Sequence, residues 1–221
     1  MCKTFPFRIF CSTFVPMNEN RNKYLLAIGE QFLKYGIKSV TMDDISKNLG
    51  ISKKTLYKYF KDKDEIVNTL MSTDIESEKQ IMETVCCKAV NAIEETYAFS
   101  NVIIDKLKDL NASLLYDLEK YHPKAWEVFI HHKRHYVYGC IKNNIERGLK
   151  EGLYRKNLNP DIIARLYSEK MDMLFDKEIF PYENYTFEEV YSEMIRYHLK
   201  GLVSKEGLKF IYEKDINNIV S

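Results

Sequence analysis

The spacing of apolar side chains along the chain predicts helices almost throughout its length. Apolar residues recur every three or four positions from Tyr24 to Tyr35, which indicates one buried face of a helix that ends before Gly36. A second, short helix is expected after Thr41, whose side chain can cap the first turn, and Gly50 provides its exit.

Two further helices are expected to follow closely. Ser52 is another N-cap residue and starts a third short helix, and a fourth helix opens near Lys63. A short helix, a tight turn containing Gly and a second short helix form the helix-turn-helix, whose second helix lies in the major groove of DNA. Leu56 and Phe60 are four residues apart, so we expect both to face inward and to hold this helix against Ile45.

The charge of the whole chain does not indicate a nucleic-acid partner, but one segment does. The 33 Lys and Arg nearly balance the 32 Asp and Glu, which leaves a net charge of +1, so any basic site must be local. Between Lys47 and Lys63 six lysines stand against one acid. The hydroxyl groups of Thr55, Tyr57 and Tyr59 lie among these lysines and can donate hydrogen bonds to phosphate oxygens.

The remainder of the chain also has helical periodicity. The expected ranges are 64–86, 89–109, 111–121, 123–151, 160–178 and 186–204. Pro160 at a first helical position, and a capping box formed by Thr186 and Glu189, are the strongest start signals. Eight Gly and five Pro in 221 residues are too few turn signals for a β-sandwich or barrel. The predicted fold class is all-α, with an N-terminal three-helix helix-turn-helix domain followed by a helical bundle.

Composition also indicates the compartment. The five Cys form no CxxC motif and no Cys and His spacing typical of zinc sites, which favours a reducing, cytoplasmic setting. No run of about 18 apolar residues occurs, so we expect no membrane-spanning helix. Residues 1–16 are aromatic-rich without a signal-peptide cleavage pattern, and we expect translation to start naturally at Met17.

The N-terminal segment resembles the DNA-binding domain of the tetracycline-repressor (TetR) family over about 50 residues. The residues that carry the resemblance are Phe32, Gly36, Thr41, Ile45, Gly50, Ser52, the Thr-Leu-Tyr-Lys-Tyr-Phe block at 55–60, and Lys63. The sequence departs from the family pattern at Ser46, where Ala is usual, and at Lys54, where a small residue is common. We expect Lys54 to affect base preference rather than folding.

The resemblance implies a set of DNA contacts. The residues expected to hold the DNA backbone are Thr41, Thr55, Tyr57, Tyr59 and Lys63. The residues expected to approach base edges or flanking phosphates are Ser52, Lys53, Lys54 and Lys58. Because lysine can donate to guanine O6 or N7, Lys53 and Lys54 are the candidates for sequence specificity.

The resemblance also implies a domain organisation. We expect an N-terminal extension over 1–17, the DNA-binding domain over 18–70, an effector-binding and dimerisation domain over 71–205, and a C-terminal tail over 206–221. The expected function is a ligand-responsive repressor that binds double-stranded DNA, at a palindromic operator, as a homodimer.

The middle helices are expected to enclose a pocket for a small-molecule effector, and aromatic walls with few charges favour an apolar or aromatic ligand. The expected lining residues are Tyr97, Leu107, Tyr116, Trp126, Phe129, Ile130, Tyr136, Met171 and Phe175. The family dimerises through its last two long helices, so the resemblance implies an interface formed by 160–178 and 186–204. The residues expected there are Ile162, Leu166, Phe187, Tyr191, Met194, Ile195, His198 and Leu202. The same stripe can also pack inside its own subunit, and we expect each helix to do some of both.

Other classes of function have less support from the sequence. It contains no P-loop, GxGxxG, paired Glu-x-x-His motif or nucleophile elbow, so we expect neither an enzyme nor a bound cofactor. His131 and His135 share a helix face without a third metal ligand, and Cys86 and Cys87 are expected to be structural thiols. The alternative that stays open is a helical adaptor whose second domain binds a protein partner.

Overall fold

The computed structural model describes residues 19–108, 113–176, 178–181 and 183–214. In these residues the regular structure is helical, apart from a single antiparallel bridge between Tyr154 and Val203. The expected N-terminal extension over 1–17 lies outside the described residues. None of the helices in the described part is long and apolar enough to span a membrane.

The described residues form two compact units, and the chain passes between them three times. The first unit contains the residues up to Gln80 and the segment that ends at Ile130; the second contains 81–108 and the residues from His131 onwards. The predicted domain boundary at residue 70 therefore differs from the boundary between the two compact units. The first crossing lies ten residues further along, and the segment predicted to belong to the second domain includes a part that folds with the first.

The first unit is built from the predicted N-terminal helices and two later ones. Its helices are α1 (Glu19–Tyr35), α2 (Met42–Asn48), α3 (Lys53–Tyr59), the first part of α4 (Lys63–Lys88), α6 (Ser113–Tyr121) and α7 (Pro123–His131), of which the last residue already belongs to the second unit. The core includes Ile28, Ile45 and Leu56, all fully buried, and Leu118 and Ala125 from α6 and α7 are buried in the same core. Burial of these apolar side chains explains why α6 and α7 belong to this unit.

A glycine allows α6 to approach the end of α1. Gly36 has a φ of 80°, the left-handed conformation that ends a helix. A Cβ atom there would lie 2.6 Å from Oγ of Ser113, so a larger residue would also collide with α6. The buried carboxylate of Asp117 accepts a hydrogen bond from the backbone N–H of Lys38 at 2.8 Å, which ties α6 to the turn after α1.

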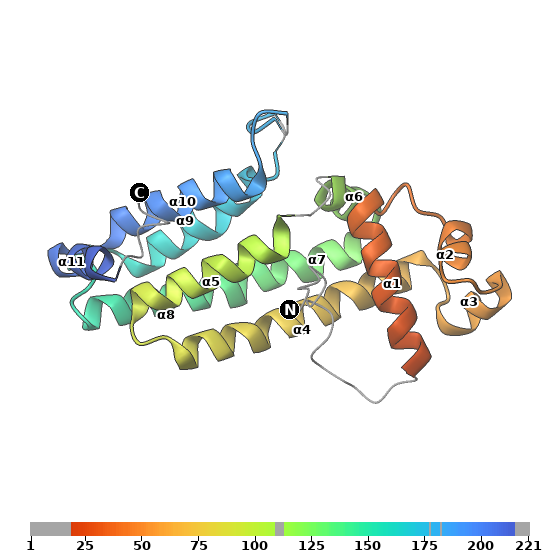
Figure 1. Ribbon diagram of the computed structural model, residues 1–221, viewed down its shortest axis with the longest axis horizontal. Coiled ribbons are helices and arrows are strands. Elements are labelled where there is room, and N and C mark those ends of the chain that lie inside the picture. The colour runs from red at the N-terminus through yellow and green to blue at the C-terminus, as the bar shows by residue number, and fades with distance from the viewer. Residues whose placement is uncertain (1–18, 109–112, 177, 182, 215–221) are drawn as a thin grey trace. The chain divides into compact units, whose positions relative to one another are not determined.

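The second unit is a bundle. Its helices are the end of α4, α5 (Ala92–Leu107), a π-helical segment η2 (His132–Val137), α8 (Tyr138–Lys150), α9 (Pro160–Met173), α10 (Phe187–Leu202) and α11 (Lys205–Glu213). Helices α9 and α10 run side by side (Figure 1), and the hydroxyl groups of Tyr167 and Tyr191 lie 3.1 Å apart between them. Ile145, Tyr191 and Leu199 are among the fully buried core residues.

Several predicted boundaries need correction. The expected helix over 89–109 starts at Ala92, because the Asn91 side chain accepts hydrogen bonds from the first-turn backbone. The expected helix over 123–151 is three consecutive segments, α7, η2 and α8, and the helix expected to reach 178 ends at Met173. The predicted C-terminal tail contains α11, whose first turn is capped by Ser204.

Candidate nucleic-acid interface

The two short helices of the helix-turn-helix are fixed by their own caps. Thr41 and Asp44 form a reciprocal capping box at the start of α2, in which each side chain accepts a backbone N–H of the other residue. Gly50 has a φ of 65° in the turn, and the Ser52 hydroxyl accepts the Thr55 N–H at 3.1 Å to start α3. The predicted caps are therefore confirmed, and they set where the reading helix begins.

One face of α3 is held in the core and the other is open to solvent. Leu56 and Phe60 are buried and join the core that contains Ile45, as the four-residue spacing predicts. The exposed residues of this segment are Ser52, Lys53, Lys54, Tyr57 and Lys58. An anchored helix with three exposed lysines has the geometry and charge that binding in the major groove requires.

Two departures from the family pattern are accommodated. Ser46 is buried, but its hydroxyl donates to the backbone carbonyl of Asp43 at 2.9 Å, so its polar group is satisfied. Lys54 is exposed, where a long side chain meets no steric limit.

The lysines expected to read bases are not equivalent. The ammonium of Lys53 forms an ion pair with the Asp43 carboxylate of α2, whereas no ion pair is recorded for Lys54 or Lys58 within the described residues. Lys53 therefore differs from Lys54 and Lys58 in having a carboxylate partner on its own surface.

Three of the remaining predicted backbone contacts, Thr55, Tyr59 and Lys63, are only partly exposed. Tyr59 packs edge-on against Tyr24 of α1, with ring centroids 5.2 Å apart. The ammonium of Lys63 lies 5.7 Å from the ring centroid of Phe32, and burial lowers the pKa of Lys63. Thr41 is exposed beside the start of α2.

Two residues that position α3 were missed by sequence reasoning. Arg21 of α1 donates to the backbone carbonyl of Tyr59 at 3.3 Å and to the Glu65 carboxylate at 3.0 Å. The same carboxylate accepts the backbone N–H of Lys61 at 2.7 Å, and the Arg21 guanidinium lies 4.9 Å from the ring centroid of Phe60. Arg21 thus joins α1 to the end of α3 and the start of α4. The periodicity of α1 marks Arg21 only as a polar-face residue, so no local signal indicates this contact.

The predicted effector-pocket residues do not all belong to one unit. Trp126 and Phe129 are stacked with ring centroids 5.4 Å apart and pack on the core of the first unit, and Tyr116 is exposed on α6. Ile130 also falls in the first unit. The residues that pack together in the second unit are Tyr97, Leu107, Tyr136, Met171 and Phe175. The predicted lining residues therefore fall in both units, because α6 and α7 pack apolar side chains on the core of the first unit.

The predicted dimer residues separate into three groups by exposure. Tyr191, Ile195 and Leu202 are buried in the core of their own subunit, so they are not available to a partner. Ile162 and Leu166 of α9 are 54% and 51% exposed. The residues of intermediate exposure are Phe187, Met194 and His198. The expectation that the stripe packs partly within its own subunit is confirmed for α10.

The histidines and cysteines offer little alternative chemistry. The rings of His131 and His135 lie 4.4 Å apart, but the described residues contain no group of three or more potential metal ligands. Between these histidines, the buried ammonium of Lys133 pairs with the Asp172 carboxylate at 2.6 Å. Burial raises the pKa of the Cys86 thiol to about 12, so this thiol stays protonated at neutral pH and is a poor nucleophile.

The capped and anchored α2 and α3, with a cationic outer face and an all-helical second unit, define a helix-turn-helix DNA-binding protein. Residues 25–70 match the model of the bacterial regulatory proteins of the tetR family. These residues therefore form a DNA-binding domain of the tetR type.

The chain is also similar to proteins of known sequence and structure. The chain is 27% identical over 189 residues to the HTH-type transcriptional regulator YvaF of Bacillus subtilis, covering 84% of this chain and 97% of YvaF. A transcriptional regulator from Saccharomonospora viridis, solved in complex with choline, has a TM-score of 0.71 at 16% identity, over 86% of this chain and all of that one. The ketosteroid regulator KstR2 of Mycobacterium tuberculosis has a TM-score of 0.60 at 17% identity, over 86% and 97%. At these identities the two structures show a shared fold.

Proposed function

We propose that this chain is a ligand-responsive repressor that acts in the cytoplasm and binds a palindromic operator as a homodimer. The observation that carries the proposal is the exposed face of α3, where Lys53, Lys54 and Lys58 stand on a helix fixed by the buried Leu56 and Phe60. Such a helix can enter the major groove without first ordering itself.

Within this proposal the side chains have different tasks. Thr41, Tyr57 and Lys63 contact phosphates, which sets the register but does not read the sequence, and Thr55 and Tyr59 assist from partly exposed positions. The residues that approach bases or flanking phosphates are Ser52, Lys53, Lys54 and Lys58.

Lys63→Ala is expected to weaken binding to all DNA sequences alike and to lower the slope of log affinity against log salt concentration by about one unit, because one phosphate contact is lost. Fluorescence anisotropy titrations at several salt concentrations, on the operator and on unrelated DNA, measure both quantities. Lys124→Ala, an exposed lysine of α7, is the control. An unchanged affinity and slope for Lys63→Ala would exclude the phosphate-contact role.

The homodimer is proposed to form through α9 and α10. Ile162, Leu166 and Met173 follow one another at helical spacing on α9 and are about half exposed, and Tyr197 of α10 is 70% exposed. Exposed apolar side chains that share one helix face favour an interaction surface there. A twofold dimer presents two copies of α3, which matches a palindromic operator.

Acidification is expected to destabilise this part of the fold. Burial lowers the pKa of His198 to about 4, with a smaller effect from Lys170, and the unfolded value is near 6.5. As the pH falls from 6.5 towards 4, the unfolded chain binds a proton that the folded chain does not, so stability decreases by at most about 3 kcal/mol.

Urea unfolding between pH 4 and 7 measures this loss, and His198→Gln should remove most of it. His135→Gln, at an exposed position on η2, should retain the wild-type pH dependence. If both variants follow the wild-type curve, His198 does not carry the effect.

The effector is proposed to bind among the bundle residues of the second unit, near Tyr97, Tyr136 and Met171, which belong to its partly buried apolar layer. Aromatic and apolar walls favour an apolar or aromatic ligand. Helix α4 begins at Lys63 in the first unit and ends at Lys88 in the second, so a ligand that shifts its end can change the spacing of the two α3 helices.

The test of the function is a titration of purified protein against DNA from its own upstream region. A variant with Lys53, Tyr57 and Lys63 all replaced by alanine serves as the comparison, and thermal unfolding checks that it is folded. Specific, salt-sensitive binding that the variant lacks is the expected result. A folded dimer that binds no DNA even at low salt would contradict the proposal and favour a helical adaptor that binds a protein.

A further inference from the structure

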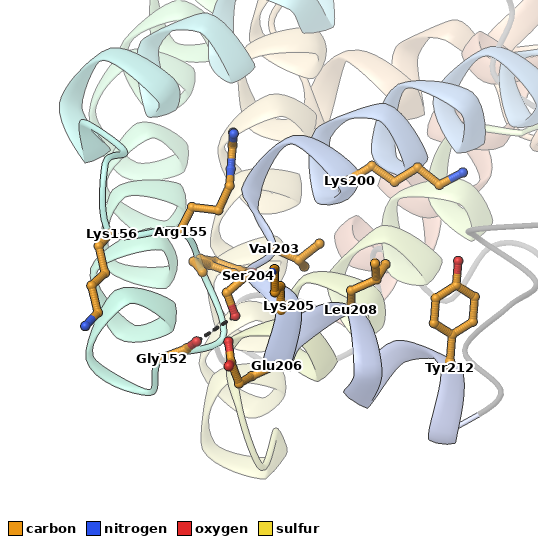
Figure 2. A pocket seen from close by; sticks show the side chains of 11 residues that line it. Gly152, Arg155, Lys156, Lys200, Val203, Ser204, Lys205, Glu206, Leu208 and Tyr212 are labelled. Atoms are coloured by element: carbon orange, nitrogen blue, oxygen red, sulfur yellow. Dashed lines mark hydrogen bonds between the residues drawn. The ribbon is translucent and has the colours of Figure 1, made fainter.

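A groove with basic walls lies within the second unit, and it shares no lining residue with the proposed effector site. The loop after α8, the end of α10 and the start of α11 enclose it, and its volume is about 700 Å³ (Figure 2). This volume lies within the range that accommodates small organic ligands. None of the residues expected from the sequence to bind DNA, effector or partner lines this groove.

Backbone contacts hold the groove together. The backbone N–H of Arg155 donates to the carbonyl of Leu202 at 2.8 Å, and that of Ser204 donates to the carbonyl of Leu153 at the same distance. The Ser204 hydroxyl donates to the Gly152 carbonyl at 2.8 Å, a bond drawn in Figure 2. Both the backbone N–H and the hydroxyl of Ser204 therefore bind the loop after α8 to the start of α11. These bonds fix the walls of the groove without a ligand.

Close packing of α11 supports the same conclusion. A Cβ atom at Gly207 would lie 2.1 Å from the backbone oxygen of Leu153, so α11 approaches the loop as closely as a glycine permits. Ile211, one turn later, is fully buried, and so is Tyr154, whose hydroxyl lies 3.1 Å from the Asn144 side-chain oxygen. The walls are therefore anchored in the core of the second unit.

Most of the charged residues that line the groove are basic. Arg155, Lys156, Lys200 and Lys205 line it together with one acid, Glu206. The guanidinium of Arg155 donates to the backbone carbonyl of Gly201. Among the described residues, no ion pair within 4 Å is recorded for any of the three lysines. An excess of unpaired positive charge in a concave surface concentrates anions.

The single acid, Glu206, offsets only one of the four positive charges in the groove. Its own backbone N–H and the Ser204 hydroxyl hold the pKa of Glu206 below its usual range, and Lys205 and Lys156 lower it further. Lys156 and Lys205, which come from two different segments of the chain, therefore both lie close enough to Glu206 to favour its charged form.

Apolar side chains complete the lining. Val203 is buried at the base, and Leu208 and Tyr212 of α11 are exposed along one side, as Figure 2 shows. Lys156 and Arg155 lie on the side opposite Tyr212. The groove thus combines a cationic end with an apolar wall.

We propose that this groove binds a small organic anion, with a phosphate or carboxylate head near Lys156 and Lys205 and an apolar body along Leu208 and Tyr212. The site is separate from the proposed effector site, and it does not depend on the proposal that the chain is a ligand-responsive repressor. Its location between α8, α10 and α11 would allow such an anion to brace the end of the bundle.

Isothermal titration calorimetry of the full chain with octyl phosphate and with octanoate tests the proposal, and the two probes distinguish a phosphate from a carboxylate head. Octyl glucoside, which has the same apolar chain without charge, and inorganic phosphate, which has only the head, are the control ligands. We expect one site per chain for at least one of the octyl anions, an affinity that falls with salt, and much weaker binding of both controls.

Matched variants localise the binding. Lys156→Gln combined with Lys205→Gln is expected to weaken binding of the octyl anion by about tenfold, because two charge contacts are lost. Lys150→Gln combined with Lys209→Gln removes two exposed lysines from α8 and α11 outside the groove and should leave the affinity unchanged. All four positions are exposed, so both variants should fold.

Two results would overturn the proposal. One is that neither octyl anion binds at millimolar concentration. The other is that both lysine pairs give the wild-type affinity, which would place any observed binding elsewhere, such as in the proposed effector site. Loss of DNA binding does not affect either readout, so failure of this proposal is distinguishable from failure of the proposed regulator function.

Discussion

Leu166→Glu is expected to separate the proposed dimer into monomers and to reduce affinity for a palindromic operator by about a hundredfold or more. Leu166 is 51% exposed at the middle of the stripe on α9, flanked by Ile162 and Met173. In a twofold interface the substitution buries two carboxylates without partners, which costs several kcal/mol. A monomer binds a single half-site and loses the contribution of the second reading helix.

Analytical ultracentrifugation measures whether the variant is a dimer, and an operator titration measures its affinity for DNA. Val128→Glu on α7 is the matched control, because Val128 is also an exposed apolar residue but lies outside the stripe. We expect that control to remain dimeric and to bind DNA with nearly wild-type affinity. If Leu166→Glu sediments as the wild type does, α9 does not form the interface.

Phe60→Ala is expected to decrease the free energy of unfolding by about 3–5 kcal/mol, which is the cost of removing a large, fully buried aromatic side chain. Phe60 is 1% exposed and closes α3 against the core of the first unit. Its ring also lies beneath the Arg21 guanidinium, so the contact between α1 and the end of α3 weakens as well. DNA binding should fail because α3 is no longer held in place.

Tyr57→Ala, on the same helix, is expected to weaken DNA binding without destabilising the fold. Tyr57 is 51% exposed, so we expect a change in unfolding free energy below about 0.5 kcal/mol, together with weaker DNA binding. Urea denaturation measures the free energy of unfolding of both variants, and DNA titration measures their affinity for DNA. Together they separate a loss of stability from the loss of a DNA contact. A Tyr57→Ala protein that is as unstable as Phe60→Ala would show that Tyr57 is a core residue rather than a DNA contact.

Local chemistry explains why the sequence predicted the DNA-binding half so closely. Thr41, Ser52 and Gly50 act on backbone groups within three or four residues, so their roles can be read without knowledge of distant contacts. The four-residue spacing of Leu56 and Phe60 likewise predicts which face of α3 is buried. The family resemblance then assigns a function to the exposed face.

The missed helix α11 had a local signal of the same type. Ser204 is an N-cap residue followed by apolar residues at helical spacing, and the structure confirms that it caps the first turn. A helix within the predicted C-terminal tail is therefore indicated by residues close together along the chain.

Packing partners, in contrast, depend on surfaces that meet only after folding. Apolar periodicity shows that α6, α7 and α10 each bury one face, but it does not identify the core that receives it. Trp126 and Phe129, predicted to line an effector pocket, pack on the core of the DNA-binding unit, and Tyr191 and Ile195, predicted at a dimer interface, are buried inside their own subunit.

The sequence by itself determined the all-helical class, the caps and turn of the helix-turn-helix, and the cationic outer face of α3. Each of these depends on residues close together along the chain. Only the tertiary structure decided that Arg21 fixes the end of α3 and that a basic groove forms between α8, α10 and α11. The physical reason is that both arise from residues far apart in the sequence, whose proximity is produced by burial of separate apolar faces and is not encoded in any local pattern.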